Sequence, residues 1–346
     1  MKNDTLTALP GVLVGHATHL DKLTGVTVVT FDRDLPVAYT SYGGSLGTFN
    51  TDTFTNGKSD NRAHALFIAG GSWHGLRAGA EIINQLASNG TGYKMARVVN
   101  PCVAGAVVYD LGLRIDEFDQ LYGKEAVNNV SSSPVQRGNV GAGTGAAVGK
   151  FRYFDNGRLF AGMKAGVGCS RVDLGNGAIV CALSVVNAIG NIILPDGTTL
   201  AGNRDANNDG KLLDFDWFSD FVTQKETNTT VTIVGTNVDL RARESYERVA
   251  HLATHGHVRA INPVNTALDG DTVFVFSTEQ IKKFMFPGAI TKARGVYWNN
   301  LDVDIIGQAA AKATQLSIYD ACRSANTIKL TSAYEGIVPS VSDYWR

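Results

Sequence analysis

Residues 228–234 have the sequence Asn-Thr-Thr-Val-Thr-Ile-Val, whose run of β-branched side chains predicts a strand. Outward from this stretch, short apolar runs bounded by Gly, Asn or Asp predict further strands at residues 25–31, 64–69, 178–186 and 272–277. Apolar residues at three- and four-residue spacing predict helices at residues 75–87, 214–223, 245–255 and 305–325. Because strands and helices mix without strict alternation, the sequence predicts an α+β layered sandwich, with residues 1–346 in a single domain.

Composition narrows the classes of partner. The 31 Lys and Arg residues nearly balance the 32 Asp and Glu residues, which gives a formal net charge of −1 and no basic run. We therefore expect no binding to nucleic acid or to a membrane. The first twenty residues lack the long apolar region of a secretory signal, and the cysteines show no CxxC pairing; they are Cys102, Cys169, Cys181 and Cys322. These features predict a soluble, cytoplasmic protein with free thiols.

Residues 138–150 form a glycine-rich run, Gly-Asn-Val-Gly-Ala-Gly-Thr-Gly-Ala-Ala-Val-Gly-Lys. A dinucleotide-binding GxGxxG motif is not met, because Ala146 stands where the third glycine belongs. A nucleotide-binding P-loop fails too, because Phe151 follows Lys150 where Ser or Thr would bind magnesium. A glycine-packed turn is the better interpretation, and it leaves the role of Lys150 open.

Two segments carry residues that bind metals in other proteins. His251, His255 and His257 are close together, but Leu252 stands where a zinc-binding HExxH helix has its glutamate, so a solvated helix end is favoured. The segment from Asp205 to Asp216 places oxygen-bearing side chains at positions one, three, five and twelve and glycine at position six. That spacing approaches a calcium loop, although an ordinary Asx-rich turn is the favoured interpretation.

Two polar residues have both a structural and a catalytic interpretation. Asn187 closes the apolar run of residues 178–186, where its amide either braces the backbone or donates to a developing oxyanion. Thr229 opens a strand, which is ordinary for threonine, but a threonine freed at a chain terminus is also a nucleophile.

Several motifs, in this order along the chain, resemble those of the L-aminopeptidase/D-esterase family of self-processing hydrolases, and within it the endo-type nylon oligomer hydrolases. The resemblance spans nearly the whole chain. It is carried by the segments at residues 9–18, 24–29, 68–76, 106–111, 141–150, 185–190, 228–231 and 268–274.

The resemblance implies a layered αββα sandwich of the N-terminal-nucleophile hydrolase type, cleaved between Asn228 and Thr229 into an α-chain of residues 1–228 and a β-chain of residues 229–346. It implies a catalytic set consisting of Thr229, Asn187 as oxyanion donor, Lys150, Asp269, Asp271 and Tyr109. It implies hydrolysis of linear amides of ω-amino acids or of short peptides, without a cofactor, by a tetramer of αβ units. An aminopeptidase that needs a free substrate N-terminus, an acyl transferase and a processed non-catalytic subunit are the alternatives.

The chemistry of Thr229 agrees with this interpretation. A threonine hydroxyl is a poor nucleophile unless a base lies within hydrogen-bond reach. Cleavage before Thr229 would free an α-amine whose ordinary pKa is about 7.7–8.0, attached to the nucleophile itself. Asp269 and Asp271, separated by one glycine, are placed to hold and orient that ammonium group.

Overall fold

The computed structural model describes residues 2–55, 57–58, 61–111, 118–154, 159–205, 211–216, 219–220, 228–282, 284, 301–331 and 335–345. Its centre is a nine-stranded mixed sheet. The strands follow one another in the order β12 (Val167–Gly175), β13 (Ala178–Asn187), β16 (Thr229–Val238), β18 (Thr272–Ile281), β2 (Thr24–Ser41), β4 (Arg62–Ala69), β7 (Val103–Val107) and β3 (Thr48–Phe49), with β1 (Val12–His19) also paired to β2. Neighbours are antiparallel except for the parallel pairs β16–β18 and β4–β7.

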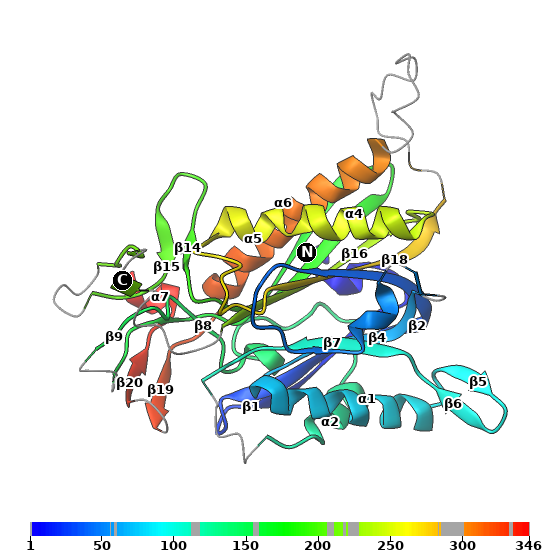
Figure 1. The fold of residues 1–346 in the computed structure, drawn as a ribbon, viewed down its shortest axis with the longest axis horizontal. Helices are drawn as coiled ribbons and strands as arrows, with labels where there is room; N and C mark the ends of the chain where they lie inside the picture. Colours follow the sequence, from blue (N-terminus) through cyan, green and yellow to red (C-terminus); the bar gives the residue numbers. More distant parts are fainter. Residues whose placement is uncertain are drawn as a thin grey trace.

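Strand β2 joins the two halves of this sheet. Residues 24–31 of β2 pair with β1, while residues 37–41 pair with β18. The register with β4 shifts between Thr30 and Leu35, which marks the irregularity at which the strand passes from one half to the other. The two halves therefore lie face to face as a sandwich (Figure 1).

Helices cover both outer faces of the sandwich (Figure 1). On one face, α6 (Leu301–Arg323) packs on β12, β13 and β16, α4 (Arg243–Ala253) packs on β2 and β18, and α5 (His255–Ala260) packs against α6. On the other face, α2 (Tyr122–Asn128) packs on β1 and β2, and α1 (Arg77–Ser88) packs on β7 and α2. Three buried apolar clusters fill the spaces between the four layers; the central one includes Phe31, Ile68, Leu183, Ile233 and Phe274. The layered α+β prediction is confirmed.

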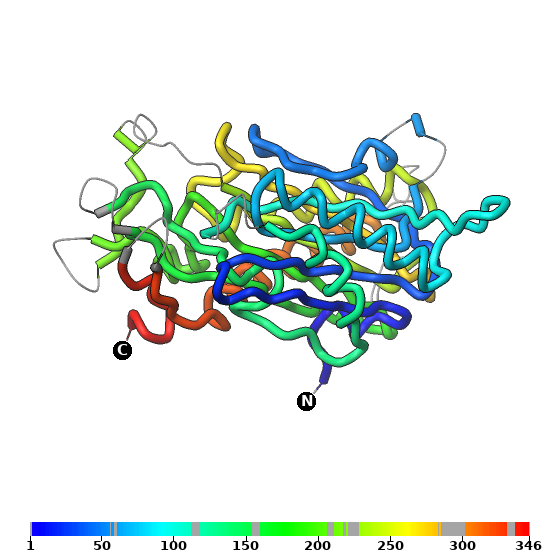
Figure 2. Tube along the Cα trace, turned by 90° about the horizontal axis from the view of Figure 1, so that it is seen from below, coloured from blue at the N-terminus to red at the C-terminus, as the bar shows by residue number. Residues whose placement is uncertain are grey.

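Smaller elements surround this sandwich. The short helical turns are η1 (Leu6–Ala8), η2 (Thr51–Phe54), η3 (Ser72–Leu76), η5 (Gly141–Gly143) and α7 (Val341–Tyr344). The short strands are β5 (Tyr93–Met95), β6 (Val98–Asn100), β8 (Ala147–Val148), β9 (Tyr153–Phe154), β10 (Leu159–Phe160), β11 (Met163–Lys164), β14 (Asn191–Ile193), β15 (Thr199–Ala201), β17 (Ile261–Asn262), β19 (Ile328–Thr331) and β20 (Glu335–Val338). Figure 2 shows the β5–β6 hairpin at one end of the elongated molecule and the C-terminal elements at the other.

The strands predicted from the sequence are all present, whereas the helices differ in detail. The periodic segment at residues 245–255 forms α4 and then α5, which are separated at Thr254. Helix α6 begins at Leu301, one turn earlier than predicted. Half of the residues of the helix predicted at 214–223 lie outside the described residues.

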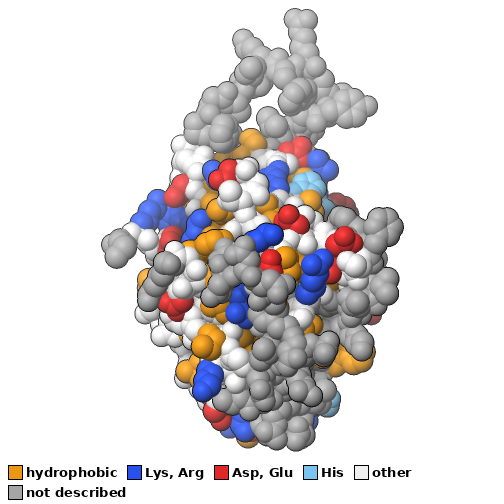
Figure 3. Space-filling model, turned by 90° about the vertical axis from the view of Figure 1, so that its left-hand side faces the viewer, with side chains coloured by type: hydrophobic (Ala, Val, Ile, Leu, Met, Phe, Trp, Pro, Cys, Tyr) orange, Lys and Arg blue, Asp and Glu red, His pale blue; other side chains and the backbone are white. Residues whose placement is uncertain are grey.

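The described surface is of mixed charge. Lys and Arg side chains alternate with Asp and Glu over the described part of the face in Figure 3, in keeping with the net charge of −1. No helix of the described residues is long and apolar enough to cross a membrane. The described cysteines are free thiols; Cys169, Cys181 and Cys322 are buried and Cys102 is half-buried.

Candidate active site

Sheet register brings the predicted residues together at one end of β16. Thr229 is the first residue of β16 and pairs directly with Asn187, the last residue of β13. On the other side, Asn228 forms a parallel bridge with Asp269, just before β18. Thr229 is only 5% exposed, so its hydroxyl lies at the edge of the protein interior.

Two hydrogen-bond donors contact the carbonyl oxygen of the peptide bond between Asn228 and Thr229. The Thr229 hydroxyl donates to the Asn228 carbonyl oxygen. The Gly270 N–H donates to the same oxygen at 2.7 Å. A Cβ at position 270 would lie 2.9 Å from Thr229 Oγ1 and 2.7 Å from the Ser45 carbonyl oxygen, so glycine permits this close approach. The arrangement polarises the carbonyl and keeps the hydroxyl beside it, as an intramolecular attack requires.

Asn187 is the centre of a buried hydrogen-bond network. Its Oδ1 accepts from Lys150 Nζ at 2.8 Å and from the Ala147 N–H at 3.1 Å. Its Nδ2 donates to the Tyr109 carbonyl oxygen at 2.6 Å. An amide nitrogen has two N–H donors, and one of them is bonded to the Tyr109 carbonyl oxygen. Because the network fixes the orientation of the amide, the other N–H can donate to an oxyanion at Thr229. The glycine-rich run thus supplies both Ala147 and Lys150 to Asn187.

The two aspartates of the Asp-Gly-Asp motif occupy different surroundings. Asp269 Oδ2 accepts from the N–H and hydroxyl of Thr266, at 2.9 and 2.8 Å. Asp271 accepts from the Thr230 N–H at 2.6 Å and from the Asn265 N–H at 3.0 Å.

Both carboxyls are buried next to each other. Burial raises the pKa of Asp269, and it raises the pKa of Asp271 well above its usual range, where the charge of Asp269 adds to the effect. Their N–H donors and the Lys150 ammonium act in the opposite direction. Burial and the charge of Asp269 therefore favour the protonated form of Asp271.

A cavity of about 270 Å³ opens at Thr229. Tyr109 lies on its wall, as does Thr229 itself. The other lining residues come from the loop before β3, the end of β7 and the start of η3; they are Ser45, Gly47, Ser72, Trp73 and Val107. The residues that line this cavity apart from Tyr109 and Thr229 were not predicted from the sequence.

Two buried ionisable residues near the site, Asp110 and Lys164, were not predicted from the sequence. Asp110 accepts from the Thr24 hydroxyl at 2.7 Å and from the Gly71 N–H at 3.2 Å, and burial raises its pKa to about 6. Lys164 is fully buried, and its Nζ donates to the carbonyl oxygens of Gly143, Ala146 and Ala165 at 3.0, 2.9 and 2.5 Å. A lone lysine in the apolar run of residues 159–169 was a signal for such a role. Lys164 thus anchors the glycine-rich run that carries Ala147 and Lys150.

Lys164 makes folding stability depend on pH. Burial lowers its pKa from 10.5 to about 7, although the charge of Asp110 opposes the shift. Between those values the unfolded chain holds more protons than the folded chain, so this group makes stability rise as pH increases above about 7. We expect the melting temperature of the Thr229→Ala variant to increase between pH 7.0 and pH 8.5. The increase should be smaller in the double variant Thr229→Ala/Lys164→Met. Equal slopes in the two proteins would show that Lys164 titrates at its ordinary pKa.

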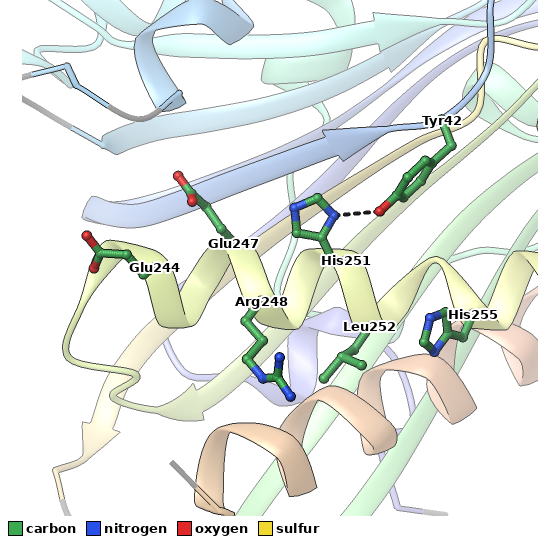
Figure 4. Close-up of a pocket in the computed structure, with 7 residues that line it drawn as sticks. All are labelled: Tyr42, Glu244, Glu247, Arg248, His251, Leu252 and His255. Atoms are coloured by element: carbon green, nitrogen blue, oxygen red, sulfur yellow. Dashed lines mark hydrogen bonds between the residues drawn. The ribbon is translucent and has the colours of Figure 1, made fainter. Parts of the chain in front are cut away.

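The histidine segment does not gather into a metal site. Figure 4 shows His251 turned toward Tyr42, whose hydroxyl lies 2.8 Å from His251 Nδ1, while His255 points away on the next turn. His257 is buried, with its Nε2 2.9 Å from the Thr232 hydroxyl. Within the described part of the chain, no three His, Cys, Asp or Glu side chains are placed to hold a metal ion.

Comparison with known proteins shows the family. Residues 4–334 match peptidase family S58. The chain belongs to that family. An uncharacterised aminopeptidase of Mycobacterium leprae is 29% identical, over 97% of this chain and 94% of its own. The 6-aminohexanoate-oligomer endohydrolase of Paenarthrobacter ureafaciens is 30% identical, over 81% of this chain and 76% of its own.

Solved structures show the same fold at low identity. The L-aminopeptidase D-Ala-esterase/amidase from Ochrobactrum anthropi, a variant of the N-terminal-nucleophile hydrolase fold, superimposes with a TM-score of 0.69 at 17% identity, covering 98% of this chain and 91% of its own. A β-aminopeptidase from a Burkholderia species gives 0.68 at 17% identity, covering 98% of this chain and 90% of its own. The family and the fold make this S58 chain an amide-bond hydrolase of the N-terminal-nucleophile type.

Proposed function

We propose that this S58 hydrolase activates itself by cutting between Asn228 and Thr229, and that the freed Thr229 then hydrolyses linear amides. The observation that carries the proposal is the placement of the Thr229 hydroxyl and the Gly270 N–H on the carbonyl oxygen of the same peptide bond. A self-cleaving precursor needs this combination of nucleophile and oxyanion donor.

In self-cleavage, Thr229 Oγ1 attacks the Asn228 carbonyl carbon, and the Gly270 N–H stabilises the resulting oxyanion. The proton of Oγ1 passes to the nitrogen of Thr229 as the C–N bond breaks, so that Asn228 becomes esterified to Oγ1 and the nitrogen becomes a free amine. Water hydrolyses the ester and releases the carboxylate of Asn228. The product is an α-chain of residues 1–228 and a β-chain of residues 229–346.

In turnover, the new α-amine of Thr229 takes the proton of Oγ1 as that oxygen attacks the substrate amide carbon. The second N–H of Asn187 stabilises the oxyanion, while Lys150 fixes the Asn187 amide. The amine product leaves with a proton, and water then hydrolyses the acyl-Thr229 ester. Asp269 and Asp271 hold the terminal ammonium group between these steps, and Tyr109 bounds the cavity. No step in this scheme calls for a cofactor.

We propose linear amides of ω-amino acids, such as 6-aminohexanoate oligomers, as substrates. Support comes from relatives of 30% identity named as 6-aminohexanoate-oligomer endohydrolases. The relative named as an aminopeptidase matches more of the chain, which favours exo-cleavage of peptides as the second candidate. Oligomers with free and with acetylated N-termini separate the two. An endohydrolase cuts both, an aminopeptidase cuts only the free form, and cleavage of neither contradicts the proposed function.

The assembled enzyme is proposed to be a cytoplasmic tetramer of αβ units, as the resemblance to the family implies. Analytical ultracentrifugation of the cleaved protein measures this directly. A mass near four times the 36.9 kDa chain is expected, and a monomer or dimer mass contradicts the tetramer.

Calcium binding by the segment from Asp205 to Asp216 stays a prediction. Its central positions, including Asp209, lie outside the described residues. At its end, an Asp216 oxygen already accepts from the Ser219 N–H at 2.9 Å. If the loop binds calcium, chelator-treated protein should give a saturable heat signal on titration with calcium and a higher melting temperature, and Asp209→Ala should weaken both. A flat titration would identify the segment as an Asx-rich turn.

A further inference from the structure

Trp73 stands exposed at the mouth of the Thr229 cavity. It lines that cavity, yet 67% of its surface is exposed. Its indole N–H donates to the Leu46 carbonyl oxygen at 3.3 Å, and the Leu46 side chain is itself 41% exposed. Single exposed apolar side chains are common on protein surfaces. Trp73 lines the cavity and is joined to the Leu46 backbone by this hydrogen bond, and we define Trp73 and Leu46 as the apolar rim.

The backbone holds Trp73 outward. Gly71 and Ser72 have φ values of 77° and 55°, and the Ser72 N–H donates to the Val108 carbonyl oxygen at 3.0 Å. A serine in the left-handed region is uncommon, and such residues gather at functional sites. A Cβ at Gly47 would lie 2.5 Å from Val107 Cγ2 and 3.1 Å from the Trp73 ring, so glycine at this position leaves room for both side chains. The turn and the glycine fix the ring at the rim.

We propose that the apolar rim is a substrate platform, on which an unbranched methylene segment next to the scissile amide packs against the indole face. This inference rests on the proposed function and names the part of the substrate that the rim recognises, an unbranched methylene segment. An indole held rigidly offers a large flat apolar surface at little cost in side-chain entropy. The hydroxyl-bearing residues that line the cavity, Thr229, Ser45 and Ser72, are left for the amide group itself.

The test measures how the rate depends on chain length. Two series of linear amides are used, one lengthened from two to six carbons on the acyl side and one on the amine side. In the wild type, kcat/KM should rise with length in at least one series. Trp73→Ala should lose about tenfold on the longest amide of that series and little on the shortest, the loss expected when roughly two methylene groups return to water. Trp73→Phe should retain most of the dependence, and both variants should still cleave themselves.

Trp345 is the matched control. It is 50% exposed, and its indole N–H also donates to a backbone carbonyl oxygen, that of Leu200, at 3.1 Å. It lies outside the residues that line the cavity, so Trp345→Ala should leave the length dependence unchanged. If Trp73→Ala lowers kcat/KM equally at every chain length, Trp73 only positions the loop. If Trp73→Ala lowers kcat/KM at no chain length, the apolar rim does not bind the substrate. Either result overturns the platform.

Binding gives a readout that does not depend on turnover. Hexanamide should quench part of the tryptophan fluorescence of the wild type in a saturable way, and it should not quench that part in Trp73→Phe. A wild type that hydrolyses neither series contradicts the proposed function, whereas the hexanamide titration still decides whether the rim binds a methylene chain. Absence of any Trp73-dependent quenching contradicts the platform even in an active enzyme.

Discussion

Thr229→Ala is expected to remain one uncleaved chain and to hydrolyse no amide. The substitution removes both the hydroxyl that lies on the Asn228 carbonyl oxygen and the only nucleophile of the proposed turnover. Loss of a catalytic nucleophile costs about 10⁴-fold or more in kcat. Denaturing mass spectrometry should show fragments 1–228 and 229–346 for the wild type and a single chain of 346 residues for the variant.

Thr230→Ala is the control for this experiment. Thr230 is the next residue of the same strand, is fully buried and loses the same atoms, but its side chain points to the opposite face of the sheet. It should lower stability while leaving cleavage and turnover per folded molecule intact. Thr229→Ser, which keeps the hydroxyl, should still cleave itself. Wild-type protein that turns over amides while remaining full length would contradict self-activation at Asn228–Thr229.

Asn187→Ala is expected to lower kcat by about 10²-fold or more and to slow self-cleavage, with KM little changed. The Asn187 amide both faces the start of β16 and organises its surroundings, since Lys150 Nζ and the Ala147 N–H donate to it. The same substitution should also lower the free energy of unfolding by about 1–3 kcal/mol, because buried donors lose their acceptor. Melting temperature, extent of cleavage and kcat are therefore measured on one preparation.

Asn203→Ala separates the two effects. Asn203 is also fully buried, and its Nδ2 braces the same part of the chain by donating to the carbonyl oxygens of Gly149 and Arg152 at 2.6 and 2.9 Å. The free energy of unfolding of Asn203→Ala should fall to a similar extent, while turnover per folded molecule is retained. If Asn187→Ala behaves in the same way as Asn203→Ala, Asn187 is a structural brace and has no part in stabilising the oxyanion.

Much of the fold followed from local pattern. The β-branched run at residues 229–234 and the periodic segments of α1 and α6 express preferences that act over a few residues, so they are visible in the sequence. The predicted site residues were found because motifs in a fixed order resemble a family, and sheet register then places Asn187, Thr229 and Asp269 side by side. The lack of strict alternation between helices and strands also favoured a layered α+β sandwich over a doubly wound sheet.

Only the tertiary structure showed how these residues are held. Gly270 supplies its N–H because β18 pairs in parallel with β16, and neither strand encodes that pairing by itself. Lys164 became part of the site because the carbonyl groups of Gly143 and Ala146, from a distant turn, converge on its ammonium group together with that of Ala165. Trp73 is ordinary in sequence, and its position at the cavity depends on a left-handed turn and on the glycine opposite it. Such contacts join residues far apart in the chain, so packing decides them and local sequence preference does not.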